Sequence, residues 1–145
     1  MKRFFFIAEV ITVLPEVVGE DHIITPACFA DALDGKNAEA IVIRTLSNPP
    51  AKLAQQYSNT NPPFLSKETI DLFNAKNIDH ILIDMPSIDK EVDGGVLAAH
   101  HAFWNYPVNV RKEKTITEMI YVPNNVQDGT YLLNIQIASF ENDAS

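Results

Sequence analysis

Two histidines and a glutamate in the second half of the chain are the residues best suited to do chemistry. His100 and His101 follow an apolar segment and an acidic linker with a Gly-Gly pair, and Glu118 lies further on. A carboxylate and an imidazole near the end of a buried strand can hold a divalent metal ion, which can activate water for hydrolysis. No other part of the chain offers comparable chemistry, so metal-dependent hydrolysis is the first hypothesis.

Each of these residues also has a plainer interpretation. On a helix, His100 and His101 point about 100° apart, so only one of them can face a shared site. A lone histidine is more often structural or exposed than a ligand. Glu118 shares a face with the isoleucines two positions before and after it in a predicted strand, and a core-facing carboxylate is costly unless it is paired or bound to metal. Alternatively, Glu118 lies on an edge strand and points to solvent.

The remaining polar candidates favour structural roles. Asp84 ends an apolar segment and could line a site, but an aspartate ahead of a proline is more typical of a turn. Ser87 lacks the Gly-x-Ser-x-Gly context of a nucleophile. Cys28 has no visible base nearby and is predicted to be a small buried side chain. His22 and His80 each stand alone at the start of an apolar segment and are predicted to be structural.

Composition excludes several classes of protein. The 145 residues, 46% of them apolar, are enough for one domain with a core. With a net charge of −8 and 11 scattered Lys and Arg residues, binding to nucleic acid is not expected. A single cysteine excludes an intrachain disulfide and suits a cytoplasmic protein. No segment reaches the roughly 20 apolar residues of a membrane span, and Glu9 interrupts the apolar start too early for a signal peptide.

The hydrophobic pattern predicts a single α/β domain. Loops are expected over 15–21 and over the proline-rich segment 46–63. A strand–helix–strand order suggests a βαβ crossover with parallel strands. The predicted strands are 3–13, 22–24, 40–45, 78–84, 115–122 and 130–138. The predicted helices are 25–35, capped by Thr25 with Pro26 in its first turn, 67–76, capped by Ser66, and 96–105.

Five short motifs, in order along nearly the whole chain, resemble the cyclase family of metal-dependent hydrolases, which includes bacterial kynurenine formamidase (arylformamidase). The order of the five motifs, rather than any single one, carries the resemblance. The motifs are Ile41–Thr45 (family "vliRTg"), Ile81–Asp89 ("iDtPSvD"), Ala99–His101 ("aHh"), Thr115–Glu118 ("ilE") and Asn142–Ser145 ("DaSPvRa").

The resemblance implies a fold, an activity and site residues. The fold is a swivelling β/β/α domain over residues 1–145, incomplete at both ends. The metal ligands, for zinc or manganese, fall on His100 and Glu118. His101 is the alternative ligand or, if uncoordinated, the general base. The substrate is a small molecule with an amide or cyclic amide, similar to the N-formylkynurenine of tryptophan catabolism.

One departure from the family limits the implied activity. The family's main metal motif, His-x-Gly-Thr-His-x-Asp, does not occur in this sequence. One histidine and one glutamate do not make the usual site of three protein ligands and a water. The chain therefore resembles the C-terminal part of such an enzyme, or a non-catalytic remnant that acts through assembly. Because missing segments would leave apolar surface at Phe4, Phe5 and Phe6, we expect a homo-oligomer.

Overall fold

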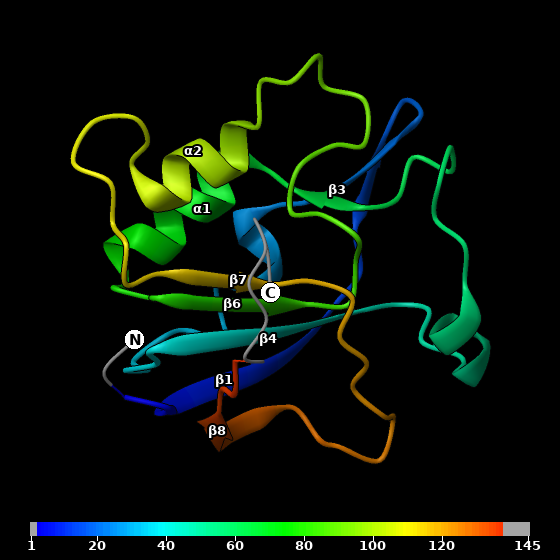
Figure 1. Cartoon of the computed structure of the whole chain (residues 1–145). Helices are drawn as coiled ribbons and strands as arrows, with labels where there is room; N and C mark the ends of the chain where they lie inside the picture. Colours follow the sequence, from blue (N-terminus) through cyan, green and yellow to red (C-terminus); the bar gives the residue numbers. More distant parts are fainter. Residues whose placement is uncertain (1–2, 138–145) are drawn as a thin grey trace.

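A five-stranded mixed sheet forms the centre of the protein (Figure 1). The computed structural model describes residues 3–137. The strand order is β7-β6-β4-β1-β8; the first four strands are parallel, and β8 pairs antiparallel with β1. The strands are β1 (Phe5–Val13), β4 (Ala40–Thr45), β6 (His80–Ile83), β7 (Thr115–Thr117) and β8 (Gly129–Asn134).

A second, three-stranded sheet lies beside the first. Its order is β2-β3-β5, and its strands are β2 (Glu16–Val18), β3 (Asp21–Ile24) and β5 (Phe64–Leu65). Strands β2 and β3 form an antiparallel hairpin, and Gly19 in its tight turn has a φ of +64°. Such turns need a positive φ, which glycine adopts without strain. Two short 3₁₀ helices, η1 (Pro26–Cys28) and η2 (Pro50–Ala54), lie in the connections.

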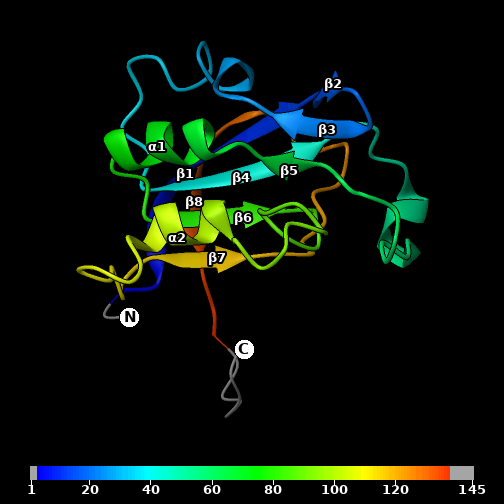
Figure 2. The same ribbon diagram turned by 90° about the horizontal axis from the view of Figure 1, so that it is seen from above.

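Helices α1 (Lys67–Ala75) and α2 (Ala98–Trp104) lie together on one face of the central sheet (Figures 1 and 2). The Ser66 hydroxyl accepts a hydrogen bond from Thr69 N, as expected of an N-cap. Phe73 of α1 and Phe103 of α2 are fully buried in the core beneath the helices. A smaller core on the opposite sheet face includes Phe6. The prediction of exposed apolar surface is therefore wrong for Phe6, which is buried, whereas Phe4 and Phe5 are exposed.

Five of the predicted strands and helices are confirmed. Strand 40–45 and helix 67–76 match β4 and α1, and strands 3–13 and 78–84 and helix 96–105 match β1, β6 and α2 after trimming at their ends. Strands β4 and β6 are parallel neighbours joined through α1, as the βαβ interpretation predicts. Their carboxyl ends therefore lie at one edge of the sheet, where sites in such folds form.

Two predictions for the first third of the chain are wrong. The helix over 25–35 is only the 3₁₀ turn η1 followed by further turns. The Thr25 hydroxyl donates to Glu16 Oε1 at 2.5 Å and makes no cap hydrogen bond, so the first turn lacks the stabilisation that its sequence predicted. The predicted loop over 15–21 instead contains β2 and the hairpin turn.

The last two predicted strands are shorter than expected. The strand over 115–122 ends at Thr117, because the backbone turns at Met119, whose φ is +57°. Glu118 therefore follows a strand rather than lying inside one. The strand over 130–138 corresponds to β8, which ends at Asn134. Within residues 3–137, no helix combines the length and apolarity needed to cross a bilayer. The Asn142–Ser145 motif lies outside the described residues.

Candidate metal site

His100 is held in one orientation by a buried carboxylate. Its Nδ1 lies 2.6 Å from Asp89 Oδ2. The same carboxylate accepts hydrogen bonds from the backbone N–H groups of Ala99 at 2.7 Å and of His100 at 3.2 Å. Asp89 is 7% exposed, so it is well shielded from water. It therefore fixes both the start of α2 and the imidazole ring.

The second nitrogen of the His100 ring faces Glu118. His100 Nε2 lies 3.6 Å from Glu118 Oε1. An ionised carboxylate only accepts hydrogen bonds, so the Asp89 contact favours the proton on Nδ1 and leaves a lone pair on Nε2. The predicted convergence of His100 and Glu118 is thus present in the fold. Their roles as ligands stay predictions.

Glu118 is positioned by the end of β7 and by the β6–α2 connection. Its Oε1 accepts a hydrogen bond from Ile88 N at 3.1 Å. The next residue, Met119, donates its N–H to Met85 O at 3.0 Å, which fixes the backbone after the strand. Among residues 3–137, Oε1 is the Glu118 oxygen that accepts a hydrogen bond, so Oε2 is available to a ligand.

The two carboxyl groups differ in their electrostatics. Burial raises the pKa of Glu118 above its usual value, and this outweighs the opposite effects of the Ile88 N–H and of His100. Burial also acts to raise the pKa of Asp89, but hydrogen bonds from the His100 ring and from two backbone N–H groups lower it below the usual range. Asp89 is thus the carboxyl group that more readily stays ionised. The ionised form of Glu118 is disfavoured by burial, so a nearby positive charge would stabilise it.

This arrangement fits two positions of a divalent metal site. Bonds of about 2.0–2.2 Å from an imidazole nitrogen and a carboxylate oxygen can meet at one ion when the two atoms are 3.6 Å apart. A metal-ligating histidine usually donates its other N–H to a carboxylate, as His100 does to Asp89. Among residues 3–137, however, no group of three His, Cys, Asp or Glu side chains is placed to hold a metal. The described residues thus bring together two candidate ligands and one carboxylate that orients the histidine.

His101 lies apart from this pair. Its ring packs 4.9 Å from the Tyr106 ring, measured between centroids, and it lines a surface groove between α1 and α2. His100 instead approaches the Trp104 ring at 5.3 Å. The hydrogen bonds and ion pairs found within residues 3–137 do not link His101 to Glu118. The structure therefore brings together His100 and Glu118 but not the proposed general base.

Other polar candidates occupy structural positions. Asp84 is 2% exposed and accepts hydrogen bonds from Thr45 N, from the Thr45 hydroxyl and, at 2.7 Å, from Lys52 Nζ. His80 is buried, with its Nδ1 2.9 Å from Thr115 Oγ1. Cys28 is half-buried against the core.

Sequence reasoning missed Asp89, although the residue stood at the end of a quoted motif. The sequence carries no local signal for this role, because Asp89 lies nine residues before Ala98, the first residue of α2, and Leu97 occupies the N-cap position. The folded chain nonetheless places its carboxylate within hydrogen-bond distance of the Ala99 and His100 N–H groups. That position brings the carboxylate next to the His100 ring.

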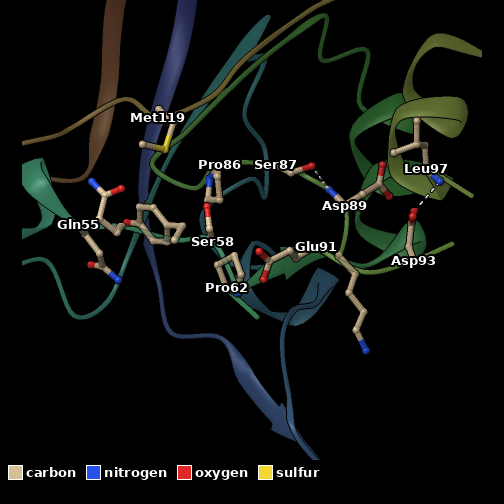
Figure 3. A pocket seen from close by; sticks show the side chains of 13 residues that line it. Gln55, Ser58, Pro62, Pro86, Ser87, Asp89, Glu91, Asp93, Leu97 and Met119 are labelled. Atoms are coloured by element: carbon tan, nitrogen blue, oxygen red, sulfur yellow. Dashed lines mark hydrogen bonds between the residues drawn. The ribbon is translucent and has the colours of Figure 1, made fainter. Parts of the chain in front are cut away.

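A pocket of about 530 Å³ adjoins the site. Figure 3 shows its wall, to which Ser87, Asp89 and Met119 contribute. Asp89 is hydrogen-bonded to His100, Met119 follows Glu118 in the sequence, and Ser87 accepts a hydrogen bond from Asp89 N. The pocket therefore places open space beside the candidate metal ligands.

The comparisons with known proteins identify the fold. No protein-family model and no curated protein sequence matches the chain. A predicted metal-dependent hydrolase from Bacillus stearothermophilus is similar in structure, with a TM-score of 0.57 and 16% identity over 87% of this chain and 52% of that one. The fold is cyclase-like. Isatin hydrolase A from Labrenzia aggregata, bound to benzyl benzoate, gives a TM-score of 0.51 and 16% identity over 86% of this chain and 52% of that one.

These likenesses confirm the α/β fold of the cyclase-like type. At 16% identity they establish the fold and not the reaction. The chain spans about half the length of both structures, since it covers 52% of each.

Proposed function

We propose that this chain contributes to a cyclase-like, metal-dependent hydrolase in which His100 and Glu118 are two ligands of a divalent ion. The observation that carries the proposal is the orientation of His100. Its Nδ1 is anchored to Asp89 at 2.6 Å, while its Nε2 faces Glu118 Oε1 at 3.6 Å. The description of one structural neighbour as a predicted metal-dependent hydrolase supports it.

The roles of the three residues follow from their contacts. Asp89 keeps the Nε2 lone pair free and aimed, and increases the basicity of the ring. Glu118 supplies a carboxylate whose burial makes a nearby cation favourable. A divalent ion such as zinc or manganese, when bound there, supplies Lewis acidity that lowers the pKa of water to about 7 and polarises a carbonyl group. The reaction proposed is the hydrolysis of an amide or cyclic amide in a small molecule similar to N-formylkynurenine.

Further ligands must come from outside the described residues. Two protein ligands hold a divalent ion weakly, because no rigid cage orders the remaining positions. We propose that a histidine segment upstream in a longer protein, or a second subunit, completes the site. The half coverage of both structural neighbours supports this division of the site.

Activity measurements test the proposed function. With added zinc or manganese, the 145-residue chain alone is expected to show formamidase activity at or near background. A longer protein that includes the His-x-Gly-Thr-His segment should be active, and His100→Ala or Glu118→Gln should abolish that activity. His22→Ala is the matched control, because His22 is exposed on β3 in the second sheet. Robust metal-dependent turnover by the short chain would overturn the proposed ligand set.

The role of His101 needs its own variant. In the active longer protein, His101→Ala distinguishes two roles of this histidine: a general base or a surface residue without a part in the reaction. Loss of kcat with unchanged metal content would support a base, reached after a rearrangement of α2. Unchanged kcat would place His101 outside the reaction, in agreement with its packing against Tyr106.

A second candidate function is assembly without catalysis, favoured by an exposed apolar surface at the sheet edge. Leu132 of the edge strand β8 is 69% exposed, and Ile7 and Phe5 beside it on β1 are 42% and 55% exposed. Such an edge favours pairing with another chain. Metal content separates the two functions: the assembly module would bind no metal through His100 and Glu118.

Under both functions we expect a dimer or higher oligomer. A clean monomer in sedimentation at high micromolar concentration would contradict that.

A further inference from the structure

A segment with two glycines separates Asp89 from the histidine that it orients. Asp89 Oδ2 lies 2.6 Å from His100 Nδ1, and the two residues are 11 positions apart in the sequence. Between them, Gly94 and Gly95 both have a positive φ. Glycine leaves the backbone free to adopt many conformations, so the sequence between the two residues does not by itself hold them together. The chain on each side of the glycines must be fixed by other contacts.

The side nearer to α2 is fixed by contacts of its own. Asp93 accepts hydrogen bonds from Gly95 N at 2.7 Å and from Leu97 N at 2.6 Å, which closes the turn that contains the glycines. Asn74 of α1 donates from Nδ2 to Ala102 O of α2 at 3.0 Å, which joins the two helices. These contacts lie at the helix end of the segment, so its start needs a separate anchor.

Glu91 anchors the start of the segment to the proline-rich loop of residues 46–63. Its Oε1 accepts a hydrogen bond from Asn59 N at 2.6 Å, and its Oε2 accepts one from Asn61 N at 3.0 Å. Both asparagines have a positive φ, of 61° and 48°. Turns with such residues direct backbone N–H groups towards a common point, where an anion binds. Figure 3 shows the Glu91 carboxylate turned towards the part of the loop that carries Pro62.

The neighbouring Lys90 extends the same anchor to the β2–β3 hairpin. Lys90 Nζ donates to Asp21 Oδ2 at 2.8 Å. Asn61 Nδ2 donates to Asp21 Oδ1 and to Glu20 O, each at 2.9 Å, so Asn61 contacts both the hairpin and Glu91. Hydrogen bonds from Asn61 and Lys90 lower the pKa of Asp21 below its usual value, which keeps this carboxylate ionised. Three segments that are distant in the sequence therefore meet here.

We propose that Glu91 is a positioning residue of the candidate metal site. It holds the backbone that follows Asp89 against the proline-rich loop. The Asp89 carboxylate then stays on His100 Nδ1, and His100 Nε2 stays directed at Glu118. The consequence for metal binding rests on the proposed function, whereas the orientation of the imidazole can be measured in the metal-free chain.

The tautomer of His100 in the metal-free full chain tests the proposal. In long-range ¹H–¹⁵N NMR spectra at about pH 8, where histidine is neutral, the contact with Asp89 should keep the ring proton on Nδ1. Glu91→Ala should raise the fraction of rings with the proton on Nε2 at least about threefold, which is the effect of about one hydrogen bond on an equilibrium.

Zinc affinity gives a second readout. In a titration followed by the His100 Nε2 resonance, Glu91→Ala should raise the apparent Kd for Zn²⁺ about three- to tenfold, because a less firmly oriented ring must be ordered on binding. Glu20→Ala is the matched control and should change neither readout. It removes a neighbouring exposed carboxylate but leaves the hydrogen bonds from Asn59 and Asn61 to Glu91 in place.

A conservative variant separates positioning from stability. Glu91→Gln keeps one side-chain oxygen that can accept from the N–H of Asn59 or of Asn61, so it should restore part of the Nδ1 tautomer. A residue that only stabilises the loop would lower the melting temperature of Glu91→Ala and leave the His100 tautomer as in wild type. Glu91→Gln also decides the question if Glu91→Ala does not fold, because loss of one of two hydrogen bonds should still raise the Nε2-protonated fraction above that of wild type.

Three outcomes would overturn the proposal. The first is a wild-type His100 tautomer in Glu91→Ala, or in Glu91→Gln where only that variant folds. The second is an equal change in Glu20→Ala, which would assign the effect to charge alone. The third is an unchanged Kd for Zn²⁺ in Glu91→Ala when the wild type binds zinc through His100. A wild-type chain whose His100 does not respond to Zn²⁺ would instead contradict the proposed function, and the metal-free tautomer would still decide the role of Glu91.

Discussion

Asp84 and Asp89 are two buried carboxylates of the same segment, yet their surroundings lead to opposite roles. Asp84 is bonded to Thr45 and to the Lys52 ammonium group, which in turn donates to Thr45 O and to the Thr45 hydroxyl. That network is closed, since each charged group has its partners. Asp89 is bonded to His100, whose second nitrogen faces Glu118 rather than a hydrogen-bond donor.

The comparison shows that burial of a charged group alone does not indicate function. Both aspartates are less than one-tenth exposed. The difference lies in whether the series of hydrogen-bonded groups that starts at the aspartate is completed within the protein. The network of Asp84 ends in backbone and hydroxyl oxygens, which ties the proline-rich loop to the sheet. The network of Asp89 ends at the Nε2 lone pair of His100, which is chemically able to bind a metal ion.

Removing Asp84 should have the largest effect on stability. Asp84→Ala leaves the Lys52 ammonium group buried without its counter-ion, which costs about 3–5 kcal/mol of the free energy of unfolding. Urea titration of the variant measures this loss. The double change Lys52→Met with Asp84→Leu should restore much of it. If Asp84→Ala loses less than about 1 kcal/mol, the network is not the structural tie described above.

Changing Asp89 should act on metal binding more than on stability. Asparagine can still accept hydrogen bonds from the N–H groups of Ala99 and His100, but it no longer fixes the imidazole through a carboxylate. We expect Asp89→Asn to weaken zinc affinity about 10- to 100-fold, as loss of such supporting carboxylates does elsewhere. Competition with a chromophoric chelator measures the affinity. Unchanged affinity would indicate that Asp89 serves only α2.

A smaller effect, on the pH dependence of stability, is expected from the buried His80. Burial lowers the pKa of His80 below 6.5, despite the opposing charge of Asp79. The unfolded chain therefore binds a proton near pH 6.5 that the folded chain does not, so His80 makes the protein less stable as the pH falls from about 6.5 towards the folded-state pKa.

His80→Asn should remove this part of the pH dependence. The difference in free energy of unfolding between wild type and variant, measured by urea titration from pH 7.5 to pH 5, should shrink as the pH falls. His22→Asn is the control, because that histidine is exposed. A difference that stays constant over this range would show that His80 titrates alike in both states.

Much of the fold follows from local patterns. Five apolar or β-branched residues within 40–45, all but Arg44, predict β4, and Ser66 at an N-cap predicts α1, because both patterns agree with their tertiary surroundings. Thr25 failed as a cap because its hydroxyl is bonded to Glu16, a partner that adjoins it only after β2 and β3 have paired. Strand 115–122 was overestimated because Met119 adopts a positive φ that its sequence does not signal.

Residue chemistry alone indicated His100, His101 and Glu118 as candidates, and the resemblance paired His100 with Glu118. The fold brings these two side chains together. The position of His101 depends on how α2 is rotated about its axis, and that rotation is set by packing against α1. Asp89 was missed because its partners, the His100 ring and the first N–H groups of α2, adjoin it only in the folded chain.

The central claim is that His100 and Glu118 share a divalent ion, and histidine-resolved NMR tests it most directly. In ¹⁵N-labelled protein titrated with Zn²⁺, the Nε2 resonance of His100 should shift before those of His22, His80 and His101. Glu118→Gln should greatly weaken that response, whereas Asp71→Asn on the exposed face of α1 should not. Selective shifts of His22 or His101, or a His100 response that is insensitive to Glu118, would contradict the account.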